Sequence, residues 1–226
     1  MDIQHHFIEQ GNGFPLILLH GNGEDSTYFE NQISAFSPIY HVYAIDTRGH
    51  GKTARGSAPF TIRQFADDLA GFMTFRHIEK ADILGFSDGA NIAMIFALKY
   101  PALVNKLILN GGNLDARGVK LMTQFPIEIG YRIAKLFAGR SDSAKAKAEM
   151  LGLMVNDPNI KPEELAAIKA PTLVIAGTDD MIKESHTKLI AANIPNAELS
   201  FIKGDHFIAS RNPREFNQKV LEFLQK

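Results

Sequence analysis

The sequence predicts an α/β protein with a mostly parallel central sheet of about seven strands flanked by helices, and two observations lead to this prediction. First, short apolar runs recur along the 226 residues, and most of them are continuous rather than alternating. Continuous runs are typical of strands that helices cover on both faces. Second, helical segments separate these runs, and this alternation implies parallel strands joined by right-handed crossovers.

The expected strands are six apolar runs, each bounded by polar or turn-forming residues. A weaker run at residues 3–9 is a candidate for a further strand at the start of the chain. The six runs are residues 15–20, 41–46, 81–86, 106–110, 171–177 and 199–203.

Three helical segments are expected: two that cover the sheet and one that forms a cap. Residues 61–75 carry one apolar stripe, and Thr61 with Gln64 forms a capping-box pattern at their start. Residues 88–100 are apolar almost all round, so we expect this helix near the middle of the sheet. Residues 114–165 contain no strand-like run, and we expect a helical cap there, broken at Pro126. The whole chain, residues 1–226, is expected to form one domain with this cap inserted in it.

Composition excludes several classes of function. The formal net charge is −1, and nothing in it suggests binding to nucleic acid, which calls for a basic face, or to an anionic membrane surface. No apolar run approaches the ~20 residues of a spanning helix, and the first residues lack a secretory signal pattern, so we expect a cytoplasmic protein. The chain has no cysteine, which excludes disulfides and thiolate chemistry. A small-molecule substrate is expected, and self-association into a homo-oligomer stays open.

Gly85-Phe86-Ser87-Asp88-Gly89 matches the G-x-S-x-G pattern of a nucleophile elbow. The pattern alone is weak, but here it follows an expected strand and opens an expected helix, as the elbow requires. The glycines leave room for a turn so tight that the serine hydroxyl projects above the sheet. Ser87 is therefore the expected nucleophile, and the alternative is a glycine-rich turn without chemistry.

An oxyanion hole is expected beside Ser87, because acyl transfer needs two donors aimed at the oxygen that becomes negative. One donor is the main-chain N–H of Asp88, directly after the nucleophile. The other is the main-chain N–H of Asn22, in the His20-Gly21-Asn22-Gly23 loop after the 15–20 strand. His20 itself is expected to be a structural hydrogen-bonding residue rather than a base.

In proteins with such an elbow the catalytic residues follow one another along the chain as Ser, acid and His, so the other two are expected after later strands. Asp179 and Asp180 follow the 171–177 strand, and Asp180 is the preferred acid because it lies further into the loop. His206 follows the last strand and is the expected general base. These side chains all follow strand ends, where open parallel sheets place their sites.

With these motifs assembled, the chain resembles the α/β-hydrolase superfamily over nearly its whole length. The matching segments are HGNG (20–23), DTRGHG (46–51), GFSDG (85–89), PTLVIAGTDD (171–180) and GDH (204–206). In that family the acid usually lies three residues after the glycine that ends its strand, so the resemblance also points from Gly177 to Asp180. It further implies structural roles for Arg48 and His50.

The Ser-Asp-Gly form of the elbow looks like that of biphenyl-hydrolase-like esterases, some of whose relatives accept amino-acid esters. By this resemblance Asp88 binds a substrate ammonium group, and the alternative is that it caps its helix. Apolar residues of the cap, Phe125 and Ile129 among them, are candidates for the wall of an acyl pocket.

The expected function is hydrolysis of a small carboxylic ester through an acyl-enzyme on Ser87, without metal or cofactor. Carbon–carbon bond hydrolases, enol-lactonases and cofactor-free haloperoxidases share the same triad, so they stay open as alternatives. A ligand receptor on the same fold is a non-catalytic alternative. A metallohydrolase is disfavoured because no HExxH or similar ligand spacing occurs.

Overall fold

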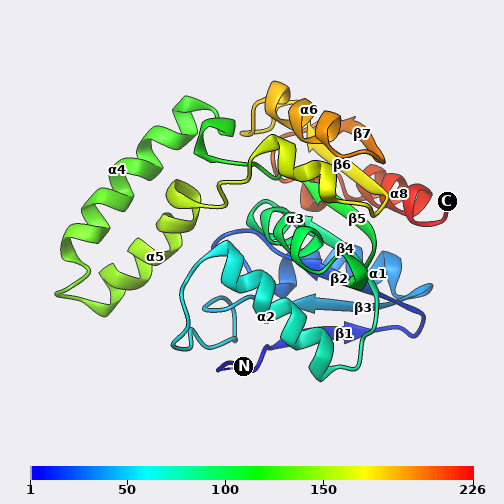
Figure 1. Cartoon of the computed structure of the whole chain (residues 1–226), viewed down its shortest axis with the longest axis horizontal. Coiled ribbons are helices and arrows are strands. Elements are labelled where there is room, and N and C mark those ends of the chain that lie inside the picture. The colour runs from blue at the N-terminus through cyan, green and yellow to red at the C-terminus, as the bar shows by residue number, and fades with distance from the viewer. Residues whose placement is uncertain (1) are drawn as a thin grey trace.

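The computed structural model describes residues 2–226, and within them one seven-stranded sheet forms the centre of the molecule (Figure 1). The strand order is β1-β3-β2-β4-β5-β6-β7, with β1 antiparallel to β3 and all other neighbours parallel. This confirms the expected α/β class. The strands are β1 (Phe7–Gln10), β2 (Phe14–Leu19), β3 (Tyr40–Ile45), β4 (Ala81–Phe86), β5 (Val104–Asn110), β6 (Thr172–Gly177) and β7 (Ala197–Ile202).

Helices cover both faces of the sheet. Side chains of α2 (Ile62–Phe75), α3 (Asp88–Lys99) and α6 (Glu184–Asn193) share one buried cluster with the sheet. Side chains of α1 (Glu30–Phe36), α7 (Ile208–Arg211) and α8 (Pro213–Leu224) share another. Short 3₁₀ helices lie at η1 (Ser26–Phe29), η2 (Pro101–Leu103), η3 (Ala116–Gly118) and η4 (Pro162–Ala167).

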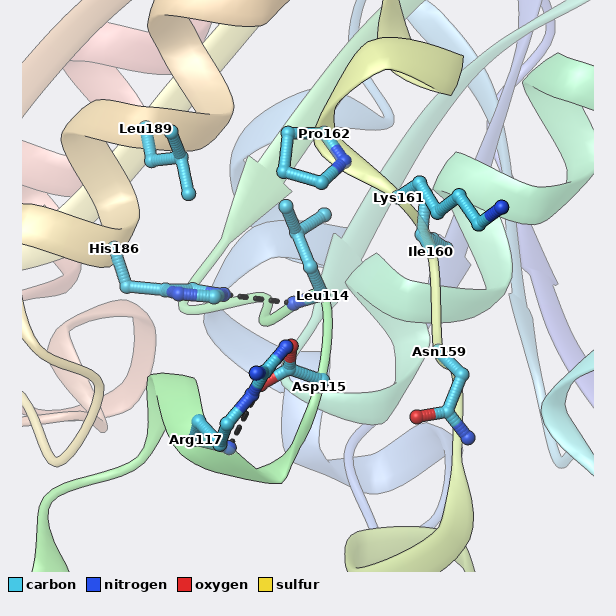
Figure 2. Close-up of a pocket in the computed structure, with 9 residues that line it drawn as sticks. All are labelled: Leu114, Asp115, Arg117, Asn159, Ile160, Lys161, Pro162, His186 and Leu189. Atoms are coloured by element: carbon cyan, nitrogen blue, oxygen red, sulfur yellow. Dashed lines mark hydrogen bonds and ion pairs between the residues drawn. The ribbon is translucent and has the colours of Figure 1, made fainter.

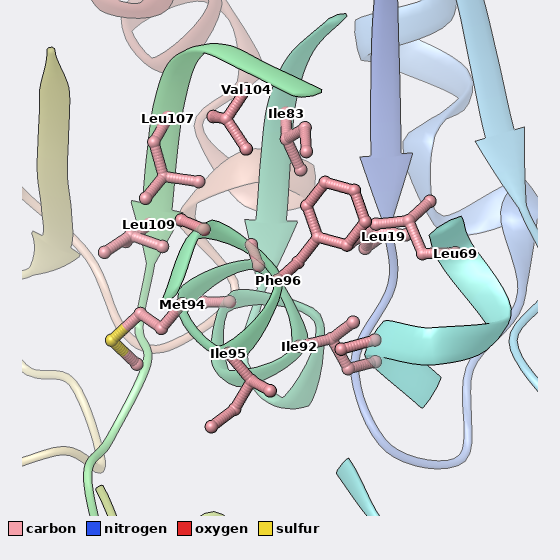
Figure 3. Close-up of a cluster of buried hydrophobic side chains, with 14 of the residues drawn as sticks. Leu19, Leu69, Ile83, Ile92, Met94, Ile95, Phe96, Val104, Leu107 and Leu109 are labelled. Carbon is pink, nitrogen blue, oxygen red and sulfur yellow. The ribbon is translucent and has the colours of Figure 1, made fainter. Parts of the chain in front are cut away.

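The two-sided cover explains the continuous apolar runs. In β2, Ile17 and Leu19 enter the cluster with α2 and α3, while Leu16 and Leu18 enter the cluster with α1 and α8. The helix α3 is buried along most of its length, and the ring of Phe96, in its C-terminal half, points towards Ile83 and Leu19 of the strands (Figure 3). The nearly uniform apolarity of this segment therefore has the expected cause.

The strand order reverses at β2, because the chain moves from β2 outward to β3 and then returns to β4 on the other side. At such a switch point the loops that follow the two central strands diverge and leave a crevice at the carboxyl edge of the sheet. Here those loops are the segments after β2 and after β4. They contain the His20–Gly23 glycine loop and Ser87.

Two helices, α4 (Leu121–Phe137) and α5 (Asp142–Asn156), form an insertion between β5 and β6. They pack against each other and project away from the sheet (Figure 1). We call this pair the α4–α5 hairpin. Within residues 2–226 no helix has both the length and the hydropathy needed to cross a bilayer.

The start of α2 and the course of α4 at Pro126 differ in part from the expectations. Thr61 begins α2 as expected, since its side chain accepts a hydrogen bond from Gln64 N–H at 3.2 Å, but the Gln64 side chain donates to Asp68 instead of closing the capping box. The expected break at Pro126 is wrong, because α4 continues through it. Pro126 deprives only the carbonyl of Met122 of its helical donor, and Met122 is 89% exposed, so water can take that place.

Candidate active site

Ser87 occupies a sharp turn between β4 and α3. Its backbone has φ 54° and ψ −118°, a strained combination for a residue with a side chain. The flanking glycines permit this turn, since a Cβ on Gly85 would lie 2.2 Å from the Gly89 carbonyl oxygen and one on Gly89 would lie 2.0 Å from that of Leu19. Ser87 therefore stands at the carboxyl edge of the sheet and at the N-terminus of the buried helix α3.

A continuous hydrogen-bonded chain joins Ser87, His206 and Asp180. The His206 Nε2 atom lies 3.0 Å from Ser87 Oγ, and the His206 Nδ1 atom lies 2.7 Å from Asp180 Oδ1. The three residues follow β4, β7 and β6, which lie within four neighbouring strands of the sheet. Since an ionised carboxylate can only accept, Nδ1 carries the proton towards Asp180 and Nε2 is free to accept the serine proton.

Asp180 and Asp179 have opposite environments. Asp180 is 3% exposed, and its Oδ1 also accepts a hydrogen bond from Ile182 N–H at 2.9 Å, which fixes the carboxylate towards His206. Asp179 is exposed, and its main-chain N–H bonds the Gly204 carbonyl. The structure thus brings Asp180, and not its neighbour, to the histidine.

The imidazole of His206 is held by aromatic packing as well as by hydrogen bonds. Its ring lies 4.9 Å from that of Phe86 and 5.5 Å from that of Phe207, centroid to centroid. Phe86 in turn stacks on Tyr28 at 4.5 Å. His206 is 4% exposed, so the ring is confined to one orientation between these side chains.

The two expected oxyanion donors lie on the loops after β2 and β4. Among the hydrogen bonds found in residues 2–226, none uses the main-chain N–H of Asn22 or of Asp88. The Asn22 side chain holds the loop in place by donating to Asp88 Oδ2 and to the Met150 carbonyl, both at 2.9 Å. The second of these bonds connects the glycine loop to α5 of the hairpin.

Asp88 is buried beside the nucleophile and has amide partners rather than a helix-capping role. It is 8% exposed, and its Oδ1 accepts from the Asn91 side chain at 3.3 Å. Burial raises the pKa of Asp88, against the effect of its bonds to Asn22 and Asn91. Burial and the charge of Asp88 also raise the pKa of Asp157 to about 6. The region therefore favours a cation or a proton near Asp88.

Glu24 is a residue beside the nucleophile that the sequence motifs do not single out. Its Oε2 accepts a hydrogen bond from Gly21 N–H at 3.3 Å. A Cβ on Gly21 would lie 3.2 Å from this oxygen and 3.1 Å from Ser87 Cβ, so both side chains lie close to Gly21. Burial raises the pKa of Glu24 to about 7, while the Gly21 hydrogen bond and His206 oppose the rise. The only sequence signal is an acidic residue directly after the glycine loop.

His20 links the loops after β2 and β3. Its Nδ1 donates to the Gly21 carbonyl at 2.7 Å, and its Nε2 accepts from Thr47 N–H at 3.0 Å. Burial lowers the pKa of His20 to about 4, so the ring is neutral at pH 7. Nearby, Arg48 is fully buried and binds both carboxylate oxygens of Asp68 at 2.7 Å. The hydrogen bonds of His20 and Arg48 hold the loops after β2 and β3 in place beside the site.

Phe125 and Ile129 lie on α4, on the side that faces away from α5. They are 60% and 43% exposed, and no hydrogen bond or aromatic contact of residues 2–226 connects them to the triad. Their expected place in an acyl pocket stays a prediction.

A cavity of about 450 Å³ lies at the base of the insertion. Figure 2 shows the residues that line it. It lies between residues 114–117, residues 159–162 and α6, where His186 Nε2 accepts a hydrogen bond from Leu114 N–H at 2.9 Å. Its lining includes none of Ser87, Asp180 and His206. The cavity is therefore distinct from the triad, and we assign it no part in the chemistry.

Comparison with known proteins supports the fold. The family model described as the alpha/beta hydrolase fold matches residues 15–149. A curated relative from Pseudomonas putida, 2-hydroxy-6-oxononadienedioate/2-hydroxy-6-oxononatrienedioate hydrolase 2, is 29% identical over 100% of this chain and 93% of its own length.

Solved structures give the same result for the fold. The meta-cleavage product hydrolase of Pseudomonas fluorescens superimposes with a TM-score of 0.79 at 25% identity, covering 99% of this chain and 94% of that one. A thermophilic esterase of Thermogutta terrifontis gives a TM-score of 0.83 at 23% identity, covering 99% and 93%. Fold, sheet topology and family match lead to one conclusion: the chain belongs to the α/β-hydrolase family and is a hydrolase.

Proposed function

We propose that this hydrolase cleaves small carboxylic esters through an acyl-enzyme on Ser87. The observation that carries the proposal is the unbroken chain from Ser87 Oγ through His206 to Asp180, with links of 3.0 and 2.7 Å. An imidazole at hydrogen-bonding distance from a serine hydroxyl is the arrangement that general-base activation requires.

In the proposed reaction, Ser87 Oγ attacks the ester carbonyl carbon while its proton passes to His206 Nε2. The tetrahedral oxyanion is bound by the main-chain N–H groups of Asn22 and Asp88. His206 then gives the proton to the departing alcohol, and the acyl group stays on Ser87. A water molecule, deprotonated by His206, attacks the acyl carbon. The bond to Ser87 Oγ then breaks, His206 returns the proton to Oγ, and the acid is released. Asp180 holds the ring and stabilises the imidazolium formed in both steps.

The charges near Ser87 favour a neutral or cationic substrate over an anionic one. Asp88 is buried with amide partners only, and Glu24 places a second carboxyl group beside the nucleophile. A substrate ammonium would compensate Asp88, as the resemblance to amino-ester hydrolases implies. An anionic acyl group would meet uncompensated carboxylates.

Carbon–carbon bond hydrolysis is a second candidate, because the 29% identical Pseudomonas putida relative is named as a hydrolase of an oxo-dienedioate. The same serine, histidine and oxyanion donors can serve either reaction. The two candidates differ in the charge of the substrate, since that relative's substrate is a dianion.

The test is a substrate panel of p-nitrophenyl esters of increasing acyl length, amino-acid esters, lactones and a meta-cleavage dienedioate, each with wild type and Ser87→Ala. We expect ester turnover that Ser87→Ala abolishes, with amino-acid esters preferred over esters of dicarboxylic acids. Turnover of the dienedioate alone would favour the carbon–carbon candidate. No turnover of any compound would contradict both.

A further inference from the structure

The outer side of α4 carries a stripe of exposed apolar side chains. Five residues form this α4 stripe: Met122, Phe125, Ile129, Ile133 and Leu136. Each is between 43% and 89% exposed, and Leu121 and Phe137 extend the stripe at its two ends. Singly exposed apolar residues are ordinary on a protein surface, but a contiguous set of this size marks an interaction site.

The stripe lies opposite the side of α4 that packs on the rest of the protein. Gln124 and Ala134 are the buried residues of α4, and the Gln124 side chain reaches the Met154 carbonyl of α5. Helix α5 packs on this buried side of α4. The stripe on the opposite side is exposed and has no partner within residues 2–226.

The spacing of the stripe is symmetric about Ile129. Phe125 and Ile133 lie four residues before and after it, and Met122 and Leu136 lie seven residues before and after it. At about 100° per residue, all four lie within about 40° of Ile129 around the helix axis. Two copies of α4 packed antiparallel, with a two-fold axis at Ile129, would therefore place Phe125 against Ile133 of the other copy and Met122 against Leu136.

The size of the stripe also fits a second copy. A large apolar side chain presents on the order of 150–200 Å² when fully exposed, so the seven residues present roughly 700 Å² per copy. A stable protein–protein interface buries about 800 Å² on each partner. The polar residues at the edge of the stripe would supply the difference.

A lipid surface is a poorer match. Helices that lie in a membrane interface carry many Lys and Arg residues beside the apolar side. Helix α4 has Arg132 and Lys135 against Glu128, which gives little attraction to an anionic bilayer. A membrane also gives no reason for a spacing that is symmetric about one residue.

We propose that the protein forms a homodimer in which the α4 stripes of two copies pack antiparallel around Ile129. This use assigns Phe125 and Ile129 to a subunit interface instead of an acyl pocket. The closed two-fold pairing covers the α4 stripe of each copy, so the stripe recruits no third copy.

The first test is the mass in solution, by analytical ultracentrifugation over a range of concentrations. Wild type is expected to be a dimer. Phe125→Lys places a charge in the stripe and is expected to raise the dimer dissociation constant by at least about 100-fold. The matched control is Phe75→Lys on α2, because Phe75 is 58% exposed against 60% for Phe125. This control should remain dimeric. Circular dichroism of each variant verifies the fold.

The second test addresses the antiparallel register. Phe125→Lys and Ile133→Glu should each be monomeric alone and should form a heterodimer when mixed, because the new charges then face each other. In addition, the chain has no cysteine, so Ile129→Cys gives a single thiol placed on the proposed axis. Oxidation should cross-link Ile129→Cys into a dimer and leave Phe75→Cys mainly uncross-linked.

Three results would overturn the proposal. They are a monomeric wild type at every concentration, a dimer that Phe125→Lys leaves intact, and a monomer that binds anionic vesicles through the stripe. These outcomes do not depend on catalysis, so they are independent of the proposed ester chemistry.

Discussion

The Cα of Gly111 faces the imidazole of His206 so closely that a Cβ there would lie 2.8 Å from Cε1 and 2.9 Å from Nδ1. Gly111 follows β5, between the strands that lead to Ser87 and to Asp180, and its φ of +63° is also unfavourable for other residues. The position of His206, the proposed base, thus depends on Gly111 having no side chain, although β5 contributes no member of the triad.

Gly111→Ala is therefore expected to lower kcat by at least about 100-fold, because a displaced imidazole loses its alignment with Ser87. The measurement is steady-state ester hydrolysis. Gly139→Ala is the control, since a Cβ at Gly139 meets nothing within 4 Å, and it should keep wild-type activity. Full activity of Gly111→Ala would show that His206 need not occupy its observed position.

Asp180→Asn is expected to lower kcat about 10³- to 10⁴-fold, because asparagine favours the wrong tautomer of His206 and cannot stabilise the imidazolium. Asp179→Asn changes an exposed side chain and should stay within about 3-fold of wild type. Ester kinetics of the two variants decide between the adjacent aspartates. A severe Asp179→Asn beside a mild Asp180→Asn would exclude Asp180 as the acid.

Arg48→Ala should lower the free energy of unfolding by about 3 kcal/mol, because it leaves the buried carboxylate of Asp68 without its bidentate partner. Urea denaturation measures this change. Arg117→Ala is the matched control, since the Arg117 side chain is 91% exposed in its pair with Asp115 and such pairs contribute under about 1 kcal/mol. Equal effects of the two substitutions would contradict a structural role for the buried pair.

Glu24→Gln should make stability less dependent on pH. The pKa of Glu24 is raised from 4.5 to about 7, so the folded state binds this proton more tightly than the unfolded state does. The contribution of Glu24 to wild-type stability therefore falls as pH rises from about 4.5 to about 7, and the neutral variant lacks this loss.

The expected gain of Glu24→Gln over wild type is near zero at pH 4 and about 1 kcal/mol above pH 7, after allowance for partial solvent screening. Urea denaturation at both pH values measures it. Glu163→Gln, on the exposed part of η4, is the control. A gain that is the same at both pH values would show that Glu24 is not the titrating group.

Much of this architecture could be predicted from the sequence because its signals are local. Apolar runs located the strands to within a few residues, and the positions of Ser87, Asp180 and His206 after strand ends predicted their convergence. Parallel strands bring their carboxyl ends to one edge, so chain order alone carries this spatial information.

Other features depend on contacts that no local pattern encodes. The fold of Glu24 back onto Gly21 arises from a side-chain hydrogen bond within a turn, and the burial of that carboxyl arises from the surrounding loops. Pro126 was expected to end a helix by its local preference, but it lies in an exposed early turn where its cost is small. The exposed stripe of α4 looks like core in the sequence, and only the packing of α4 on α5 shows that it faces outward.

The proposed acyl-enzyme requires a nucleophilic Ser87 Oγ, and a fluorophosphonate probes this because it phosphonylates an activated serine. The protein is treated with a fluorophosphonate, and mass spectrometry of its peptides locates the adduct. We predict one adduct, on Ser87, with none on the Ser87→Ala variant and slow labelling of His206→Ala. An adduct on another residue, or ester turnover that survives in Ser87→Ala, would exclude Ser87 as the nucleophile.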